Sequence, residues 1–232
     1  MTHYPNLFCA IDTNDLDHAK TLCQQLSHTQ IGFKFGLEFF NAFGAQTIAD
    51  IQQQYPDNPI FLDLKYHDIP NTVAGAIKAV TSIFQPAYLN VHSAGGLDMM
   101  QAAKEACPDQ TKLLAVTILT SLNQDSINAV GYQNSVPDQV KQMALLTQKS
   151  GLDGVVCSSH EIKLLRRACG DDFALMVPGI RPAGSNAGDQ KRIMTPEQAI
   201  NLGATHLVIG RPITQSDDPA QTVQDILASL NG

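Results

Sequence analysis

Acidic and basic residues alternate in one short segment at the end of an apolar run. The segment DLKYHD, residues 63–68, begins within the run 60–64 and has the pattern D-x-K-x-x-D. An ammonium group held beside carboxylates can stabilise negative charge that develops on a substrate and can then donate a proton. Charged groups at the end of an apolar strand are better explained by such catalysis than by packing. The pattern therefore predicts an active site around Asp63, Lys65 and Asp68.

Two further charged residues interrupt or end apolar runs. Lys34 lies between two phenylalanines in the run IGFKF, residues 31–35, and Asp12 closes the first run, 7–11. A lysine within an apolar strand is energetically costly unless it is paired with an opposite charge. Because these runs would form neighbouring strands, we expect Asp12 and Lys34 to meet the charges of the 63–68 segment at one mouth. The alternative is an ion-pair network that only fixes strand order, and such networks contribute little to stability.

Eight short apolar runs alternate with eight amphipathic stretches along the chain. The runs that predict strands are 7–11, 31–35, 60–64, 88–92, 113–118, 154–157, 175–178 and 206–209. The stretches that predict helices are 15–27, 38–53, 70–82, 97–106, 137–150, 160–168, 196–202 and 219–230. Proline stands where four of these helices begin, at residues 70, 137, 196 and 219, because the first turn of a helix needs no amide donor there.

Alternation of strands and helices predicts parallel strands that are joined by crossover helices. Eight such units in 232 residues fit a single α/β domain spanning residues 1–232, a (β/α)8 or TIM barrel. A doubly wound open sheet is the alternative, but it usually has fewer strands, and no G-x-G-x-x-G follows the first run.

The third strand has a period of two that predicts which side chains point into the barrel. Asp63 and Lys65 share one face with Phe61, whereas Leu62 and Leu64 share the other. The two leucines would pack against the helices. Both charges are therefore directed into the barrel at its carboxyl end, where barrel enzymes place their chemistry.

Two histidines lie near these strand ends. His67 has the parity opposite to Lys65, which favours an outer or hydrogen-bonded side chain. His92 ends the fourth strand and could face the mouth. Neither histidine has a partner at the spacing of a metal-binding pair.

Glycine, arginine and glutamine gather after the seventh and eighth strands. Gly210 and Arg211 follow the eighth strand, and the loop after the seventh supplies Gly179, Arg181, Gly184, Gly188 and Gln190. These two loops often bind phosphate in (β/α)8 barrels, and a backbone amide beside a guanidinium suits that anion. We expect a glycine-rich lid that closes over a phosphate. The alternative is an ordinary surface loop.

The overall composition disfavours several classes of function. Lysine and arginine total 15 against 22 aspartates and glutamates, which gives a net charge of −7. A nucleic-acid binder would need a basic face. No apolar run approaches the roughly 18 residues of a membrane span, and no secretory leader is visible, so a cytoplasmic protein that binds no membrane is expected. The five cysteines have no C-x-x-C spacing, which argues against a disulfide framework or a zinc ribbon.

Taken together, the motifs resemble those of the orotidine 5′-phosphate decarboxylase family. The resemblance rests on D-x-K-x-x-D at 63–68, KFG at 34–36, VPGIRP at 177–182, GDQ at 188–190 and VIGRP at 208–212, and it covers nearly the whole chain. Related decarboxylases and aldolases share D-x-K-x-x-D alone, whereas the ordered set is specific. The resemblance implies a homodimeric (β/α)8 barrel that converts orotidine 5′-phosphate to UMP and carbon dioxide. This is the last step of de novo UMP synthesis, and the family needs no metal or organic cofactor.

The resemblance also implies roles for the matching charged residues. Lys65 matches the proton donor, and Lys34, Asp63 and Asp68 match the rest of the catalytic network. Asp12 and Lys34 match contacts to the ribose hydroxyls, and Asp63 also counts among the substrate-binding residues.

Other matching positions bind the remaining parts of the substrate or join the subunits. Asp68 and Thr72 match residues that complete the site of the partner subunit. Thr120 matches a contact near the pyrimidine, with its neighbour Ser121 as the alternative. The phosphate-binding positions are matched by Arg181, Gln190, Gly210 and Arg211.

Two rival functions remain open. Metal-dependent sugar-phosphate decarboxylases and aldolases of the same superfamily carry an E-x-G pattern in the second strand, with the acidic residue as a metal ligand. Here the strand has Lys34-Phe35-Gly36, and a protonated lysine cannot bind magnesium. The second rival is a catalytically silent barrel that binds a phosphosugar, and such a protein would tolerate the loss of Lys65.

Overall fold

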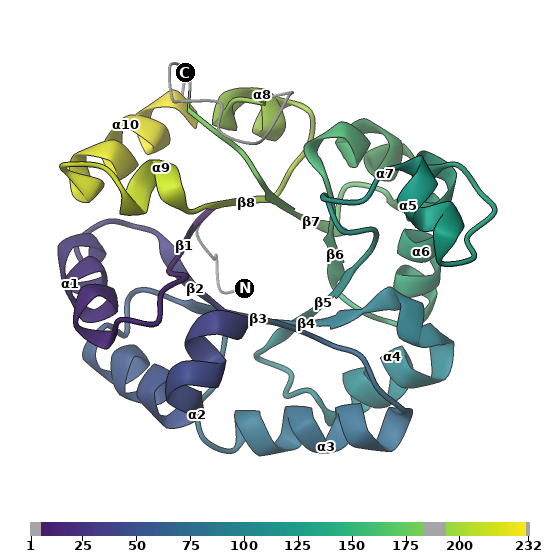
Figure 1. Ribbon diagram of the computed structural model, residues 1–232, viewed down its shortest axis with the longest axis horizontal. Helices are drawn as coiled ribbons and strands as arrows, with labels where there is room; N and C mark the ends of the chain where they lie inside the picture. Colours follow the sequence, from purple (N-terminus) through teal and green to yellow (C-terminus); the bar gives the residue numbers. More distant parts are fainter. Residues whose placement is uncertain (1–5, 183–193, 231–232) are drawn as a thin grey trace.

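A computed structural model describes residues 6–182 and 194–230 of the chain. Within these residues, eight parallel strands pair in chain order from β1 to β8, and β8 pairs with β1 to close a barrel (Figure 1). The strands are β1 (Leu7–Ala10), β2 (Gly32–Gly36), β3 (Ile60–Tyr66), β4 (Tyr88–His92), β5 (Lys112–Val116), β6 (Gly154–Val156), β7 (Ala174–Pro178) and β8 (His206–Ile209). The predicted (β/α)8 barrel is therefore confirmed, and the open sheet is excluded.

Helices form a ring around the barrel and cover its outer face (Figure 1). They are α1 (Leu16–Leu26), α2 (Leu37–Gln54), α3 (Pro70–Thr81), α4 (Gly96–Ala106), α5 (Gln124–Ala129), α6 (Val136–Lys149), α7 (Ile162–Cys169), α8 (Pro196–Asn201), α9 (Arg211–Thr214) and α10 (Pro219–Leu230). Single 3-10 turns occur at Ser93–Gly95 and Ser159–Glu161. All eight predicted helices are present. The short helices α5 and α9 were not predicted, because one or two turns give no amphipathic period.

The helices begin at residues that are typical of helix N-termini, with polar caps and prolines. The Asp15 carboxylate accepts a hydrogen bond from the backbone N–H of His18 at 3.0 Å and caps α1, and Ser135 caps α6 in the same way. Proline occupies the first turn of α3, α6 and α8. These caps supply partners for amides that have none within the helix.

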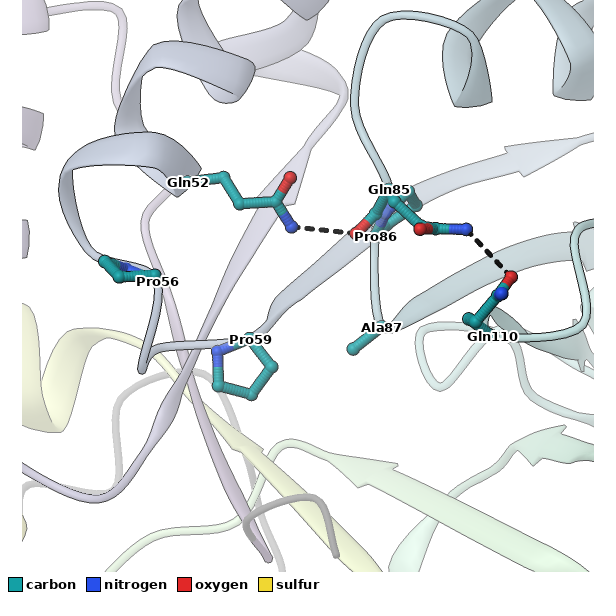
Figure 2. Close-up of a pocket in the computed structure, with 7 residues that line it drawn as sticks. All are labelled: Gln52, Pro56, Pro59, Gln85, Pro86, Ala87 and Gln110. Atoms are coloured by element: carbon teal, nitrogen blue, oxygen red, sulfur yellow. Dashed lines mark hydrogen bonds between the residues drawn. The ribbon is translucent and has the colours of Figure 1, made fainter. Parts of the chain in front are cut away.

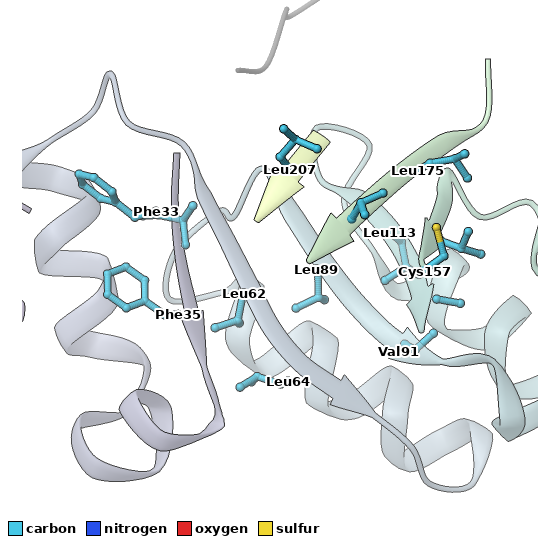
Figure 3. Packing of buried hydrophobic residues seen from close by; sticks show 14 of the residues in the cluster. Phe33, Phe35, Leu62, Leu64, Leu89, Val91, Leu113, Cys157, Leu175 and Leu207 are labelled. Carbon is cyan, nitrogen blue, oxygen red and sulfur yellow. The ribbon is translucent and has the colours of Figure 1, made fainter. Parts of the chain in front are cut away.

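Apolar side chains pack on both faces of the barrel wall. The larger cluster lies between strands and helices and includes Leu62, Leu64 and Leu89 (Figure 3). A second cluster fills the inside of the barrel and includes Phe8, Phe61 and Tyr88, with the Phe8 and Tyr88 rings edge to face at 5.6 Å. The predicted faces of the third strand are thus confirmed, because Phe61 points inward while Leu62 and Leu64 point outward.

In the described parts of the chain, no helix combines the length and the apolar character that a membrane crossing requires.

Candidate active site

Two lysines and two aspartates form a continuous series of ion pairs at the carboxyl ends of β1, β2 and β3. Lys34 Nζ donates to both carboxylate oxygens of Asp12, at 2.7 and 2.8 Å, and lies 3.8 Å from Asp63 Oδ2. Lys65 Nζ donates to the other oxygen of Asp63, Oδ1, at 2.5 Å. Negative and positive groups therefore alternate in the order Asp12, Lys34, Asp63, Lys65, which we call the ionic array.

Burial varies along the ionic array. The side chain of Lys34 is 7% exposed and that of Asp63 is 17% exposed, whereas Lys65 is 30% exposed and Asp12 is 47% exposed. The buried Lys34 ammonium is stabilised by carboxylates on two sides, as an ion in this environment requires. The Lys65 ammonium, in contrast, is accessible to a ligand that enters from the carboxyl end.

Gly36 leaves the space in which the first ion pair forms. A methyl group built on this glycine would lie 2.9 Å from Asp12 Oδ1 and 3.1 Å from Lys34 Nζ. Any larger residue would displace one of the two charged groups. This close approach explains why glycine ends the KFG motif.

The backbone of Lys65 has an unusual conformation. Among the described residues other than glycine, Lys65 alone has a positive φ, of 52°. This left-handed conformation costs about 1–2 kcal/mol for a residue with a Cβ. The strain coincides with a change of register, because Leu62 pairs with Leu89 and Tyr66 pairs with Val91, so that residues 63–65 of β3 face the single β4 residue Asn90.

Asn90 is a residue of this region that sequence reasoning missed. Its side-chain amide donates to Asp63 Oδ1 at 2.7 Å, and its side-chain oxygen accepts from the backbone N–H of Lys65 at 2.8 Å. The side chain is completely buried. An asparagine at an inward position of an otherwise apolar strand was the available signal.

Asp68 and Thr72 lie outside the ionic array. Both residues are exposed, and the Asp68 carboxylate accepts a hydrogen bond from the backbone N–H of Ile69 at 2.7 Å. Within residues 6–182 and 194–230, no ion pair joins Asp68 to a lysine or arginine of the same chain. The expected convergence is therefore seen for Asp12, Lys34, Asp63 and Lys65 but not for Asp68.

The two histidines of the rim stack on each other. The rings of His67 and His92 lie nearly parallel, at an interplanar angle of 18° with centroids 5.4 Å apart. His92 Nδ1 accepts a hydrogen bond from the backbone N–H of Ala94 at 3.2 Å. Burial, together with the neighbouring His67 and Lys65, lowers the pKa of His92 from 6.5 to about 4. His92 is therefore a neutral side chain next to the ionic array at neutral pH.

The lowered pKa of His92 predicts a loss of stability in acid. Below pH 6.5 the unfolded chain binds a proton at this position, whereas the folded chain stays neutral until about pH 4. The unfolded state then binds more protons, so the free energy of unfolding should fall as the pH drops from 6.5 to 4. Exchange His92→Asn keeps an acceptor for Ala94 but cannot titrate, and it should flatten this part of the profile.

Urea unfolding at a series of pH values measures the effect. The exposed His18, replaced by asparagine in the same way, is the matched control for the substitution itself. Equal dependence of the unfolding free energy on pH in the His92→Asn variant and the unsubstituted protein would contradict a neutral, half-buried His92.

Residues expected at the phosphate end lie after the neighbouring strands β7 and β8. Arg181 is 8% exposed, and its Nε atom has no hydrogen-bond partner within the described residues. Gly210 precedes the first residue of α9, and Arg211 is exposed at the start of that helix. Thr120 and Ser121 are exposed in the turn that follows β5. Gln190, with Gly184 and Gly188 of the expected lid, lies outside the described residues.

A separate pocket of about 410 Å³ lies at the opposite, amino-terminal end of the strands (Figure 2). Its lining comprises Gln52, Pro56, Pro59, Gln85, Pro86, Ala87 and Gln110. Hydrogen bonds from Gln52 to the Gln85 carbonyl and from Gln85 to Gln110 cross its wall. The lining holds no charged side chain, so this pocket lacks the groups that the ionic array provides.

In the part of the chain that the structure describes, no three or more histidine, cysteine, aspartate or glutamate side chains are grouped so as to bind a metal ion.

The closed barrel and the paired charges at its carboxyl end define a (β/α)8-barrel enzyme with an ionic candidate site. A sequence model of the orotidine 5′-phosphate decarboxylase / HUMPS family matches residues 5–226. The chain belongs to this family.

Relatives with curated names agree with this assignment. A protein of Rhodospirillum rubrum named orotidine 5′-phosphate decarboxylase is 47% identical over 240 residues, covering 100% of this chain and 96% of that protein. One of Pectobacterium atrosepticum with the same name is 48% identical over 225 residues, covering 95% of this chain and 90% of that protein.

Solved structures show the same fold. Orotidine 5′-phosphate decarboxylase from Lactobacillus acidophilus has a TM-score of 0.85 and 34% identity, over 99% of this chain and 100% of that chain. An uncharacterized conserved protein from Geobacillus kaustophilus has a TM-score of 0.84 and 30% identity, over 97% and 100% of the two chains.

Proposed function

We propose that the ionic array decarboxylates orotidine 5′-phosphate to UMP and carbon dioxide, the last step of de novo UMP synthesis, in the cytoplasm and without a metal or organic cofactor. Membership of the family supports this activity, as do the names of relatives that are 47–48% identical. The observation that carries the proposal is the accessible Lys65 ammonium, held by Asp63 at 2.5 Å on the rim of the barrel.

The reaction requires a cation at one defined place. Loss of carbon dioxide from C6 of the pyrimidine leaves an electron pair in the plane of the ring, where no adjacent group can delocalise it. A preorganised charge next to this carbon stabilises the developing carbanion without having to reorganise during the reaction. Lys65 provides that charge in our proposal and then transfers its proton to C6. The C–C bond pair becomes the new C–H bond, and CO2 departs.

Asp63 contributes by repelling the substrate carboxylate. The ionic array has two positive and two negative groups and is neutral, so the substrate adds an unbalanced negative charge. Two like charges about 4 Å apart repel by roughly 4 kcal/mol at an effective dielectric constant of about 20. The repulsion disappears as carbon dioxide leaves. Enzymes commonly lower barriers by about 8–23 kcal/mol, so Lys65 must supply the larger share.

The remaining roles concern substrate binding. Asp12 and Lys34 would bind the ribose hydroxyls, and Thr120 would contact the pyrimidine. Arg181, Gln190, Gly210 and Arg211 would hold the phosphate. The Nε atom of the buried Arg181, which has no hydrogen-bond partner among the described residues, supports an anion at this end, because a buried polar group without a partner carries a free-energy cost.

Replacing Arg211 by alanine tests the phosphate end. Loss of a charge-assisted hydrogen bond costs about 1.5–3 kcal/mol, so kcat/KM for orotidine 5′-phosphate should fall about 10- to 150-fold. With orotidine, which lacks the phosphate, the variant and the unsubstituted enzyme should react equally slowly. Exchange of the exposed Arg167 on α7 is the control and should change neither value. Unchanged kcat/KM for the phosphorylated substrate would show that Arg211 does not bind the phosphate.

We further propose a homodimer in which Asp68 and Thr72 complete the partner's site. Both residues are exposed, and within the described residues Asp68 forms no ion pair with the ionic array of its own chain. Ile69, between them, has 66% of its surface exposed, and a partner subunit would cover this apolar side chain.

Following the absorbance of orotidine 5′-phosphate with purified protein, with and without EDTA, tests the activity directly. We expect equal decarboxylation in both samples. Loss of activity with EDTA would favour a metal-dependent enzyme of the same superfamily, although the Lys34 ammonium occupies the position of a metal ligand there. Absence of turnover in both samples would overturn the proposal.

A further inference from the structure

We propose that Asn90 is a positioning residue for the decarboxylation, because its one side chain holds both Asp63 and Lys65 in place. The inference rests on the proposed function, since it assigns Asn90 a role in that reaction. Asn90 need not touch the substrate to act in this way.

The position of Asn90 matches the irregular part of β3. Residues 63–65 face Asn90 where the register shifts, so the Lys65 amide does not meet a carbonyl of β4 in the regular ladder. The side-chain oxygen of Asn90 accepts from this amide at 2.8 Å and replaces the missing ladder bond. A residue with φ of 52° persists only if its surroundings hold it there, and this hydrogen bond is one such constraint.

The other end of the amide sets the rotation of the Asp63 carboxylate. Asn90 Nδ2 and Lys65 Nζ both donate to Oδ1, at 2.7 and 2.5 Å, which leaves Oδ2 toward Lys34. The two lysines are thereby held on different oxygens of one carboxylate. The orientation of the Asn90 amide is unambiguous, because a carboxylate only accepts and a backbone N–H only donates.

Burial and charge make asparagine suitable for this position. The side chain has no exposed surface, and along the strand Asn90 lies two residues after Tyr88, whose ring packs inside the barrel. An amide offers a donor and an acceptor while leaving the net charge of the ionic array at zero. Leucine has nearly the same size but offers neither, and aspartate would keep only the acceptor.

Two exchanges at Asn90, each matched at Asn58, test the role. Asn58 is also buried, and its side chain donates to the carbonyls of Thr29 and Ile31, away from the ionic array. We expect Asn90→Leu to lower kcat about 100-fold with little change in KM, since small misplacements of reacting groups have effects of this size. Asn58→Leu should lose stability and keep its kcat. If the Asn90→Leu variant does not fold, the kcat of the nearly isosteric Asn90→Asp variant tests the role instead, with Asn58→Asp as its control.

A crystal structure of the Asn90 variant provides a second readout that does not depend on turnover. We expect Lys65 to leave the left-handed conformation or its Nζ to move away from Asp63. Unchanged kcat in both Asn90 variants, or an equal loss of kcat in the Asn58 variants, would overturn the inference while leaving the proposed function intact. An unsubstituted enzyme without turnover would instead overturn the function, and an unmoved Lys65 in the variant crystal would show that Asn90 does not hold it.

Discussion

Replacement of Lys65 by alanine is expected to leave a folded barrel that has lost nearly all turnover. If catalysis lowers the barrier by about 16 kcal/mol and Lys65 supplies more than half, its loss costs more than about 8 kcal/mol, which is more than about six orders of magnitude in kcat. The reason is that no other ammonium of the described chain lies as exposed beside Asp63, since Lys34 is 7% exposed and already bound to Asp12.

The fold should survive this exchange for structural reasons. Asp63 would keep its hydrogen bond from Asn90 and its proximity to Lys34. The Lys65 side chain is 30% exposed, so its removal creates no closed cavity in the core. Binding of UMP, measured by calorimetry, should therefore be weakened far less than kcat.

Lys104 offers a matched control for this experiment. Its ammonium is also paired with an aspartate, Asp153, at 2.8 Å, and its side chain is 38% exposed. Replacing it by alanine removes the same charge and a similar ion pair outside the ionic array, so turnover should remain. Near-normal activity of the Lys65→Ala variant would end the proposed mechanism.

The barrel itself could be predicted from the sequence because its physical signals are local. A parallel strand that is covered by helices needs an apolar outer face, and each of the eight strands was visible as a short apolar run. The faces of β3 could be predicted because Leu62 and Leu64 alternate with Asp63 and Lys65. The pairing of Lys34 followed from the cost of a buried lysine, which only a nearby carboxylate offsets.

Other features depend on contacts between distant residues. Nothing in the third run signals that β3 reaches Tyr66 or that its register against β4 shifts. The strained φ of Lys65 and its hydrogen bond to Asn90 are consequences of that shift. Asp68 was expected to lie with Asp63 and Lys65 because it is close to them in the sequence, but the structure separates it from the ionic array. The strand ends two residues earlier, and the chain turns toward α3 before the Asp68 side chain can reach Lys65.

The position of Asp68 leads to a test by mixing two inactive variants. If each site combines Lys65 of one subunit with Asp68 of the other, Asp68→Ala and Lys65→Ala should each inactivate both sites of a homodimer. After random exchange of subunits in an equal mixture, about half of the dimers contain one variant of each kind. One site of such a dimer has neither defect, and the other has both. Activity should therefore return to about a quarter of the normal value.

The ionic array supplies the control for this mixing experiment. Lys34 and Lys65 both contact Asp63 of their own chain, at 3.8 and 2.5 Å, so a mixture of Lys34→Ala with Lys65→Ala contains no intact site and should stay inactive. Exchange of subunits between dimers is verified by capturing mixed dimers through a tag on one of the two variants. Proven exchange without recovery in the Asp68→Ala mixture would show that Asp68 does not act across the subunit boundary. Its exposed carboxylate would then have to reach its own array by a movement of residues 67–69.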